Sequence, residues 1–198
     1  EVVVRPAATG EVAAVRALAD AADVPVTPRG AGTGLSGGAL PVHGGIALSL
    51  ERMDRILEID AENRMAVVQP GVVNQALKDA AAARGLWYPP DPASLGSCTL
   101  GGNLAENAGG PHAAKYGTTK DYVCGLEVVF PDGQTAQLGG TLVADGDPAE
   151  DSFSDILDDF TTLHQGPNRM TCFRWTIIPS AIIINETELK LIQIRQQN

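Results

Sequence analysis

The chain has 198 residues, of which 44% are hydrophobic, and its formal net charge is −10 at pH 7. This length and apolar content predict one large or two small globular domains, and they exclude fibrous, collagenous and disordered classes. The acidic excess repels phosphate backbones and no basic stripe offsets it, so we expect no nucleic-acid partner. No apolar stretch approaches the roughly 20 residues that cross a bilayer, so we expect no transmembrane segment.

The start of the chain and its cysteines indicate where the protein works. The chain begins at Glu1 without an initiator methionine or a signal-peptide pattern, which predicts a piece of a longer protein. Cys98, Cys124 and Cys172 are odd in number and too far apart for a CxxC pair, which favours a reducing compartment, the cytoplasm. The three histidines show no metal-ligand spacing, so no metal site is predicted.

The first elements in chain order predict a β-α-β arrangement. A short strand at 2–5 is followed by a helix at 11–22, where apolar residues recur at helical spacing and Thr9 is the expected N-cap. A second strand is predicted at 24–28. After a glycine-rich loop, the chain enters a third strand at 46–50.

Strand and helix patterns continue to residue 138. They predict a strand, an alanine-rich helix, a short helix and the two strands of a hairpin, in that order at 64–69, 72–84, 100–108, 123–130 and 134–138. Gly85 is placed to end the alanine-rich helix, and Asp132 with Gly133 suits the hairpin turn. Three prolines make 88–92 a rigid extended segment, because each fixes its own φ and restricts the residue before it.

The composition changes after Gly140. Isoleucine occurs three times up to that residue and eight times beyond it, whereas alanine falls from 24 to three. Residues 145–159 carry seven acids and no base, which is typical of a solvated stretch. We therefore treat 141–198 as a separate segment, either a divergent continuation of the domain or an aberrant sequence from another reading frame or exon.

The densest glycine cluster, RGAGTGLSGG at 29–38, admits several interpretations. Residues 32–37 match the GxGxxG pattern of a dinucleotide-binding turn, but the sequence after them is poorly suited to starting the required helix. Ser36 lies in a GxSxG pattern, but a nucleophile elbow also needs a strand-to-helix turn. A strand-loop-strand remains, in which open backbone N–H groups form a concave anion site that suits a diphosphate. The alternative is that the glycines serve only as tight turns.

Further motifs accompany this loop in a fixed order along the chain. The segments are RGAGTGLSGGA at 29–39, QPGV at 69–72, PDPAS at 90–94, LGGNLAENAGG at 100–110, and KYG at 115–117 followed by GLEVV at 125–129. Together they resemble the FAD-binding domain of the vanillyl-alcohol-oxidase-type (PCMH-type) flavoproteins, in the branch of the glycolate oxidase FAD-binding subunit and the D-lactate dehydrogenases.

The resemblance implies an α+β fold, in which two small α/β subdomains hold FAD between them and the second subdomain is incomplete. We assign the FAD-binding domain to 1–140, with a first subdomain at 1–70 and the start of a second at 71–140. Residues 141–198 form the divergent or aberrant C-terminal segment.

The resemblance also implies roles for residues of these motifs. The loop at 29–38 would hold the FAD pyrophosphate through backbone N–H groups, and the segments at 90–94 and 98–102 would approach the flavin. FAD is expected to bind non-covalently, because the loop contains no histidine for attachment. The implied cofactor-binding residues are Arg29, Gly30, Ala31, Gly32, Thr33, Gly34, Leu35, Ser36, Gly37, Gly38, Pro70, Gly71, Pro90, Asp91, Pro92, Ser94, Cys98, Thr99, Gly101, Gly102, Gly109, Gly110, Tyr116 and Gly117.

The implied function is that of an FAD-dependent dehydrogenase or oxidase acting on a small D-2-hydroxy acid of the lactate or glycolate type. No catalytic residue is assigned, because His112 is interpreted as a loop support and Cys98 as a packing residue. A partner subunit or a C-terminal substrate domain is therefore implied. The alternative is a non-catalytic truncated fragment that retains only part of the cofactor site.

Overall fold

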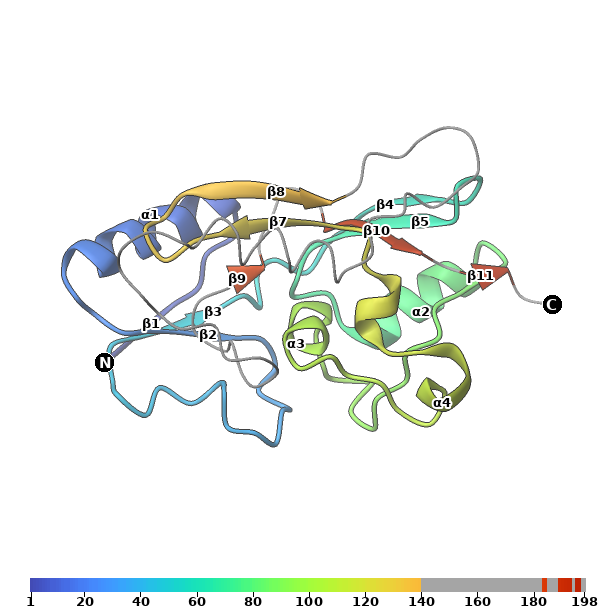
Figure 1. Ribbon diagram of the computed structural model, residues 1–198, viewed down its shortest axis with the longest axis horizontal. Coiled ribbons are helices and arrows are strands. Elements are labelled where there is room, and N and C mark those ends of the chain that lie inside the picture. Colours follow the sequence, from blue (N-terminus) through green and yellow to red (C-terminus); the bar gives the residue numbers. More distant parts are fainter. Residues whose placement is uncertain (140–182, 185–188, 194, 197–198) are drawn as a thin grey trace.

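The computed structural model describes residues 1–139, 183–184, 189–193 and 195–196 (Figure 1). Within these residues the protein is a mixture of helices and strands, as the α+β prediction requires. Most of the predicted C-terminal segment at 141–198, including its acidic stretch at 145–159, lies outside the described residues.

The N-terminal part forms a parallel sheet with one helix. The strands β1 (Val2–Val4) and β2 (Val26–Arg29) both pair in parallel with β3 (Ile46–Ser49), which gives the order β1-β3-β2. Helix α1 (Thr9–Ala21) connects β1 to β2, so the predicted β-α-β order is confirmed. No helix or strand occurs between residues 30 and 45, so the interpretations that need a helix after the glycine loop are wrong.

The prediction that Thr9 caps α1 is also wrong. Ala8 occupies the N-cap position and makes no side-chain capping bond, while Thr9 is already helical. The Thr9 hydroxyl instead donates to Glu127 Oε2 at 3.2 Å, and Glu11 Oε2 accepts the Ala7 N–H at 2.7 Å. Glu11, at the third helical position, therefore reaches back to a backbone N–H just before the helix, much as the acid of a capping box does.

A second, antiparallel sheet has the order β10-β5-β4, formed by β4 (Ile56–Asp60), β5 (Met65–Val68) and β10 (Leu189–Gln193). The pattern analysis missed β4. A register shift between Ile56 and Glu58 breaks the period of two, so that Ile56 and Ile59 both pack against the core. A bulged strand of this kind lacks the alternation by which strands are recognised.

The remaining helices and strands begin with α2 (Asn74–Ala82). Helix α2 covers nine residues of the predicted alanine-rich helix, and Gly85 follows it with a φ of +70°, as expected for a helix-ending glycine. The predicted hairpin is confirmed, and Gly133 in its turn has a φ of +84°. In chain order these elements are α2 (Asn74–Ala82), β6 (Leu86–Trp87), α3 (Leu100–Ala105), α4 (Ala113–Tyr116), a 3₁₀ helix (Thr119–Tyr122), β7 (Gly125–Val129), β8 (Thr135–Gly139), β9 (Ile183–Ile184) and β11 (Arg195–Gln196).

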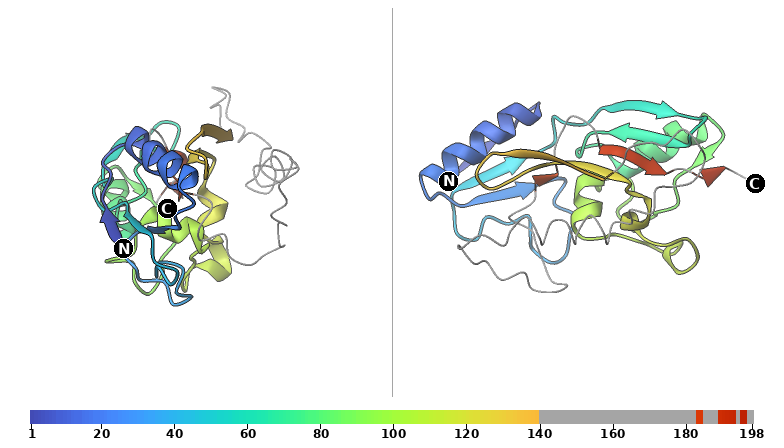
Figure 2. Two further views of the ribbon diagram at one scale, coloured as in Figure 1. Left: turned by 90° about the vertical axis from the view of Figure 1, so that its left-hand side faces the viewer. Right: turned by 45° about the horizontal axis from the view of Figure 1, so that its top comes forward.

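Two apolar cores meet at β7. One core includes Val12 of α1 and Leu48 of β3, and the other includes Leu77 of α2. Val128 belongs to the second core and Val129 to the first, because alternate residues of a strand face opposite sides. Figures 1 and 2 show α1 lying along the β7–β8 hairpin. The division into subdomains at 1–70 and 71–140 stays a prediction, and the two cores do not follow that boundary, because Ala66 and Val68 belong to the second core and Val129 to the first.

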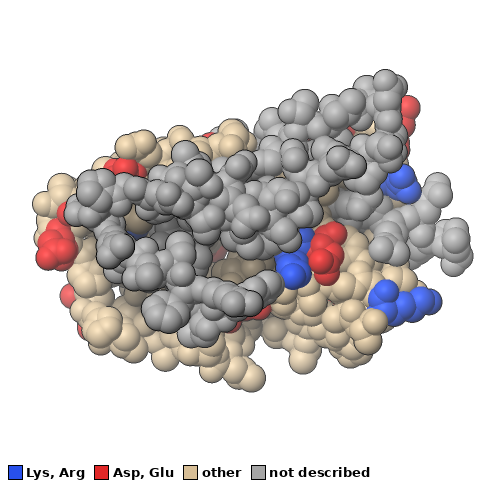
Figure 3. All heavy atoms as spheres, in the orientation of Figure 1, with Lys and Arg blue, Asp and Glu red and all other residues tan. Residues whose placement is uncertain are grey.

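The surface carries scattered charges. On the described part of the face in Figure 3, Lys and Arg side chains lie apart from one another, and one of them is adjacent to acidic side chains. Among the described helices, none has the length and apolar character that crossing a bilayer requires.

Candidate cofactor site

A cleft lies between the loop that follows β2 and the start of α3, which are close neighbours in Figure 1. About 1020 Å³ of space free of protein atoms lies in and in front of it, including open solvent at its mouth. Many predicted cofactor-binding residues line it, namely Arg29, Gly30, Ala31, Gly32, Thr33, Gly34, Gly38, Pro70, Pro92, Ser94, Cys98, Thr99, Gly101 and Gly102. Segments that are far apart in the sequence therefore line one cleft.

The glycine loop presents backbone donors that the rest of the described chain does not use. From Ala31 to Ala39, no N–H group donates a hydrogen bond to any described residue. Gly32 and Gly37 have φ values of +71° and +82°, a conformation that favours glycine. Buried N–H groups are almost always paired, but residues 31–34 and 38–39 of this loop line an open cleft, where a ligand with acceptor oxygens can reach their N–H groups.

Two charged side chains flank this row of N–H groups. The Arg29 guanidinium lies over Gly32, where a Cβ atom would come within 2.5 Å of Arg29 Nη2. On the other side, Ser36 Oγ donates to Glu106 Oε1 at 2.8 Å, which ties the loop to the end of α3. Arg29 adds a positive charge to the N–H groups, so the Arg29 side of the loop is suited to an anion, whereas the Glu106 carboxylate opposes an anion on its own side.

Close backbone approach brings the loop and α3 together. An added Cβ on Gly30 would lie 2.3 Å from Thr99 Oγ1, which accepts from the Gly102 N–H at 3.4 Å as the cap of α3. Gly101 donates its N–H to the Pro70 carbonyl at 2.8 Å, and its added Cβ would lie 2.7 Å from Pro70 Cβ. Larger residues would push these segments apart and change the shape of the cleft.

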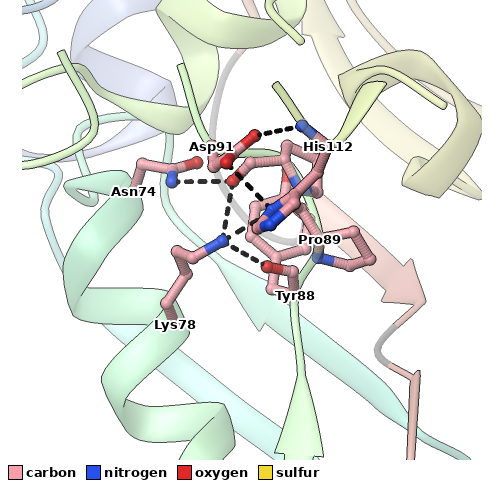
Figure 4. A network of polar contacts seen from close by, with 7 residues as sticks. Asn74, Lys78, Tyr88, Pro89, Asp91 and His112 are labelled. Carbon is pink, nitrogen blue, oxygen red and sulfur yellow. Dashed lines mark hydrogen bonds and ion pairs between the residues drawn. The ribbon is translucent and has the colours of Figure 1, made fainter. Parts of the chain in front are cut away.

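A network of polar contacts holds the proline segment behind the cleft (Figure 4). Lys78 Nζ donates to the carbonyls of Tyr88, Pro89 and Pro90 at 2.7, 3.3 and 3.0 Å. Burial lowers the pKa of Lys78, and the Coulombic effect of Asp91 opposes that shift. The proline segment is thus held by hydrogen bonds from a partly buried ammonium group of α2.

His112 supports the same segment. Its Nδ1 lies 2.9 Å from Asp91 Oδ2 and 3.2 Å from the Pro89 carbonyl, and its backbone N–H donates to Asp91 Oδ1 at 3.0 Å. The ring also makes edge contacts with Trp87 and Tyr116. Neither His112 nor Asp91 lines the cleft. The geometry agrees with the interpretation of His112 as a loop support.

The remaining predicted residues do not line the cleft: Leu35, Ser36, Gly37, Gly71, Pro90, Asp91, Gly109, Gly110, Tyr116 and Gly117. Several of these glycines are explained by packing alone. A Cβ on Gly110 would lie 2.1 Å from the Asp91 carbonyl oxygen, and a Cβ on Gly117 would lie 2.4 Å from Asp121 Oδ2. Both glycines also have positive φ, at +101° and +88°.

The pattern analysis missed some lining residues. These are Pro28, Ala39, Leu50, Asn103, Ala105, Glu106 and Ala108. Helical spacing is a signal that could have identified part of this set. Starting from the predicted Thr99 and Gly102, positions on the same face of a helix are 103 and 106, which are the positions of Asn103 and Glu106.

The comparison with protein families identifies the kind of domain. A family model described as an FAD binding domain matches residues 1–139. The chain therefore belongs to this family, its fold is of the PCMH type, and its cofactor is FAD.

Two curated relatives show the branch. The chain is 46% identical over 145 residues to the glycolate oxidase subunit GlcD of Bacillus subtilis, covering 73% of this chain and 31% of the relative. It is 48% identical over 142 residues to a D-lactate dehydrogenase of Anaerostipes hadrus, covering 72% and 30%. The chain thus matches less than a third of the length of these relatives.

Solved structures show the same fold. A 6-hydroxy-D-nicotine oxidase of Arthrobacter nicotinovorans matches 98% of this chain and 36% of its own, with a TM-score of 0.67 and 24% identity. An alkyldihydroxyacetonephosphate synthase matches 98% of this chain and 34% of its own, with a TM-score of 0.65 and 21% identity.

The residues of the cleft fit FAD. The free N–H groups at 31–39 and the guanidinium of Arg29 suit a diphosphate, which carries negative charge and many acceptor oxygens. Gly34 leaves open space at the loop, because a Cβ there would meet no described atom within 3.7 Å and Glu106 Oε1 only at 3.8 Å. A ligand can therefore approach the backbone closely at this point.

Proposed function

We propose that this chain is the cofactor-binding part of an FAD-dependent oxidoreductase that acts on a small D-2-hydroxy acid of the lactate or glycolate type. The observation that carries the proposal is the similarity to GlcD and D-lactate dehydrogenase, at 46% identity over 145 residues and 48% identity over 142 residues. FAD would accept a hydride from the carbon that bears the substrate hydroxyl, while the protein supplies binding and orientation.

In this proposal the chain's own residues act on the cofactor rather than on the substrate. The N–H groups of 31–39 and Arg29 bind the diphosphate, and Pro92, Ser94 and the start of α3 shape the flavin side of the cleft. Among the described residues, the cleft lining contains no histidine and one carboxylate, Glu106, which accepts a hydrogen bond from the Ser36 hydroxyl. We assign the base for the hydroxyl proton to a partner subunit or a further domain.

Two finer assignments belong to the same proposal. FAD binds without a covalent bond, because no histidine occurs in the glycine loop for attachment. The protein works in the cytoplasm, which accords with Cys98 and Cys124 being free thiols in the described chain.

A titration with flavins tests the proposed cofactor-binding site. The purified chain is expected to bind FAD at least about tenfold more tightly than FMN or riboflavin, because only FAD carries the diphosphate-linked adenosine. Binding is read from flavin fluorescence and from the visible absorption of the purified protein. Acid denaturation should release all of the flavin into the soluble fraction. A chain that binds no flavin would instead favour the non-catalytic fragment.

The hydroxy-acid proposal is tested in the full-length protein. Reduction of its bound flavin is expected with D-lactate or glycolate in the absence of oxygen, and the bleaching of the flavin absorption measures it. L-lactate serves as the control substrate. A flavin that is bleached equally by both lactate enantiomers contradicts the proposed preference.

A further inference from the structure

Three successive backbone carbonyls converge on one ammonium group behind the cleft (Figure 4). Lys78 Nζ donates to the carbonyls of Tyr88, Pro89 and Pro90. Within the described residues, Lys78 forms no ion pair with an acidic side chain, and its ammonium donates to these three carbonyls. A lysine that is partly buried without a carboxylate partner carries a desolvation cost, which its hydrogen bonds must offset.

The proline segment has few other means of fixing its position. Pro89, Pro90 and Pro92 have no backbone N–H, so these residues cannot anchor themselves by donating to a neighbour. Asp91 alone donates, to the Gly109 carbonyl at 2.9 Å. The location of the segment therefore depends on this bond, on the contacts between the Asp91 side chain and His112, and on donors that reach its carbonyls from other elements.

Lys78 supplies most of those donors. Besides its three contacts, Asn74 Nδ2 donates to the Pro90 carbonyl at 3.1 Å, and His112 Nδ1 lies 3.2 Å from the Pro89 carbonyl. Asn74 is fully buried, but it reaches only one carbonyl. His112 lies on the surface side of the segment and is partly exposed. Among the side chains that the structure describes, the ammonium of Lys78 is thus the group that donates to three positions of the segment.

The same segment continues directly into the cleft wall. Pro92 and Ser94 line the cleft, and they follow the pinned residues without an intervening turn of helix. A second connection runs through Asn74, whose Oδ1 accepts from Asn103 Nδ2 at 3.0 Å, and Asn103 lines the cleft from α3. A displacement of the proline segment would therefore move the wall at two places.

We propose that Lys78 is a positioning residue for the cofactor, which sets the flavin-side wall of the cleft by pinning the carbonyls of Tyr88, Pro89 and Pro90. The inference rests on the proposed function of the cleft. Lys78 does not itself line the cleft, so it acts through the segment and not by contact with FAD. Removing its ammonium should allow the proline segment and the adjoining wall of the cleft to move, while the glycine loop stays unchanged.

The experiment compares Lys78→Met with Lys78→Arg and with a control. Methionine keeps much of the apolar stem and removes the donors, whereas arginine keeps the charge but spreads its donors over a planar fork. Arg84→Met is the matched control, because Arg84 is exposed and its Nη1 donates only to the Ala80 carbonyl of its own helix. Each variant is measured for FAD dissociation constant and for the visible circular dichroism of bound flavin.

Lys78→Met is expected to weaken FAD binding about tenfold and to change the circular dichroism of the flavin. Lys78→Arg should restore part of both properties, and Arg84→Met should match the wild type. An unchanged dissociation constant and unchanged flavin dichroism in Lys78→Met would overturn the proposal, whatever its melting temperature.

Hydrogen exchange of the FAD-free chain separates this proposal from the cofactor assignment. The amides of Asp91, Leu95 and Cys98 donate within and next to the segment, so Lys78→Met should exchange them faster than the wild type does. Equal protection in both proteins overturns the pinning role. A wild-type chain that binds no FAD overturns the proposed function, and the exchange result still decides whether Lys78 pins the wall.

Discussion

Replacing Gly34 with valine is expected to abolish FAD retention while leaving the fold intact. The nearest described atoms to an added Cβ are Glu106 Oε1 at 3.8 Å and Cδ at 4.0 Å, and Gly34 has no positive φ. A Cβ at this position therefore strains neither the backbone nor its neighbours, and Gly34 lines the cleft, so we expect the added side chain to take up cleft space. We expect FAD affinity to fall by about 100-fold or more, which corresponds to about 2.7 kcal/mol. The stability of the FAD-free chain should change by less than about 0.5 kcal/mol.

The matched control for this substitution is Gly96→Val. Gly96 also has no positive φ and no atom within 4 Å of an added Cβ, but it does not line the cleft. Flavin fluorescence titration and urea unfolding are measured on both variants. Gly34→Val with wild-type affinity for FAD would show that this loop is not the diphosphate seat. Gly37 is less informative, because its φ of +82° makes any side chain strain the backbone.

Replacing Gly71 with valine is expected to destabilise the protein strongly even without FAD. An added Cβ would lie 2.4 Å from the Leu50 carbonyl oxygen and 2.6 Å from that of Met53, and the Gly71 N–H donates to the Met53 carbonyl at 2.7 Å. Backbone atoms cannot rotate away as a flexible side chain can, so the two segments must separate. We expect a loss of about 3 kcal/mol or more, a large share of the 5–15 kcal/mol typical of a domain.

Urea unfolding of the FAD-free Gly71→Val protein measures this effect, again with Gly96→Val as the control. The result distinguishes two roles for Gly71, which was predicted to contact the cofactor and lies outside the cleft lining. A packing role lowers the midpoint of unfolding in the absence of FAD. If the midpoint stays at the wild-type value and only FAD affinity falls, the packing explanation is contradicted.

Local patterns predicted the regular elements that depend on neighbours in the sequence. The helices α1 and α2 were predicted to within a few residues of their ends, because each repeats apolar residues at helical spacing. The hairpin was predicted from the Asp132-Gly133 pair, whose glycine adopts a φ of +84°. The elements before residue 140 that were missed, β4, β6, α4 and the 3₁₀ helix, are short or irregular, so few residues carry their pattern.

The sequence by itself determined the family, because the order and spacing of several glycine- and proline-rich segments can be recognised without coordinates. It also located a glycine-rich loop between two strands, and the structure places this loop at the cleft.

Only the tertiary structure decided which residues of these motifs face the cleft. Gly34 faces open space, whereas Gly71 and Gly110 face backbone carbonyls, and the sequence has the same letter at all three positions. Lys78 had no signal at all, because its partners are carbonyls, which every residue possesses. Contacts between segments distant along the chain depend on how the two cores pack, and that packing is not encoded in any local pattern.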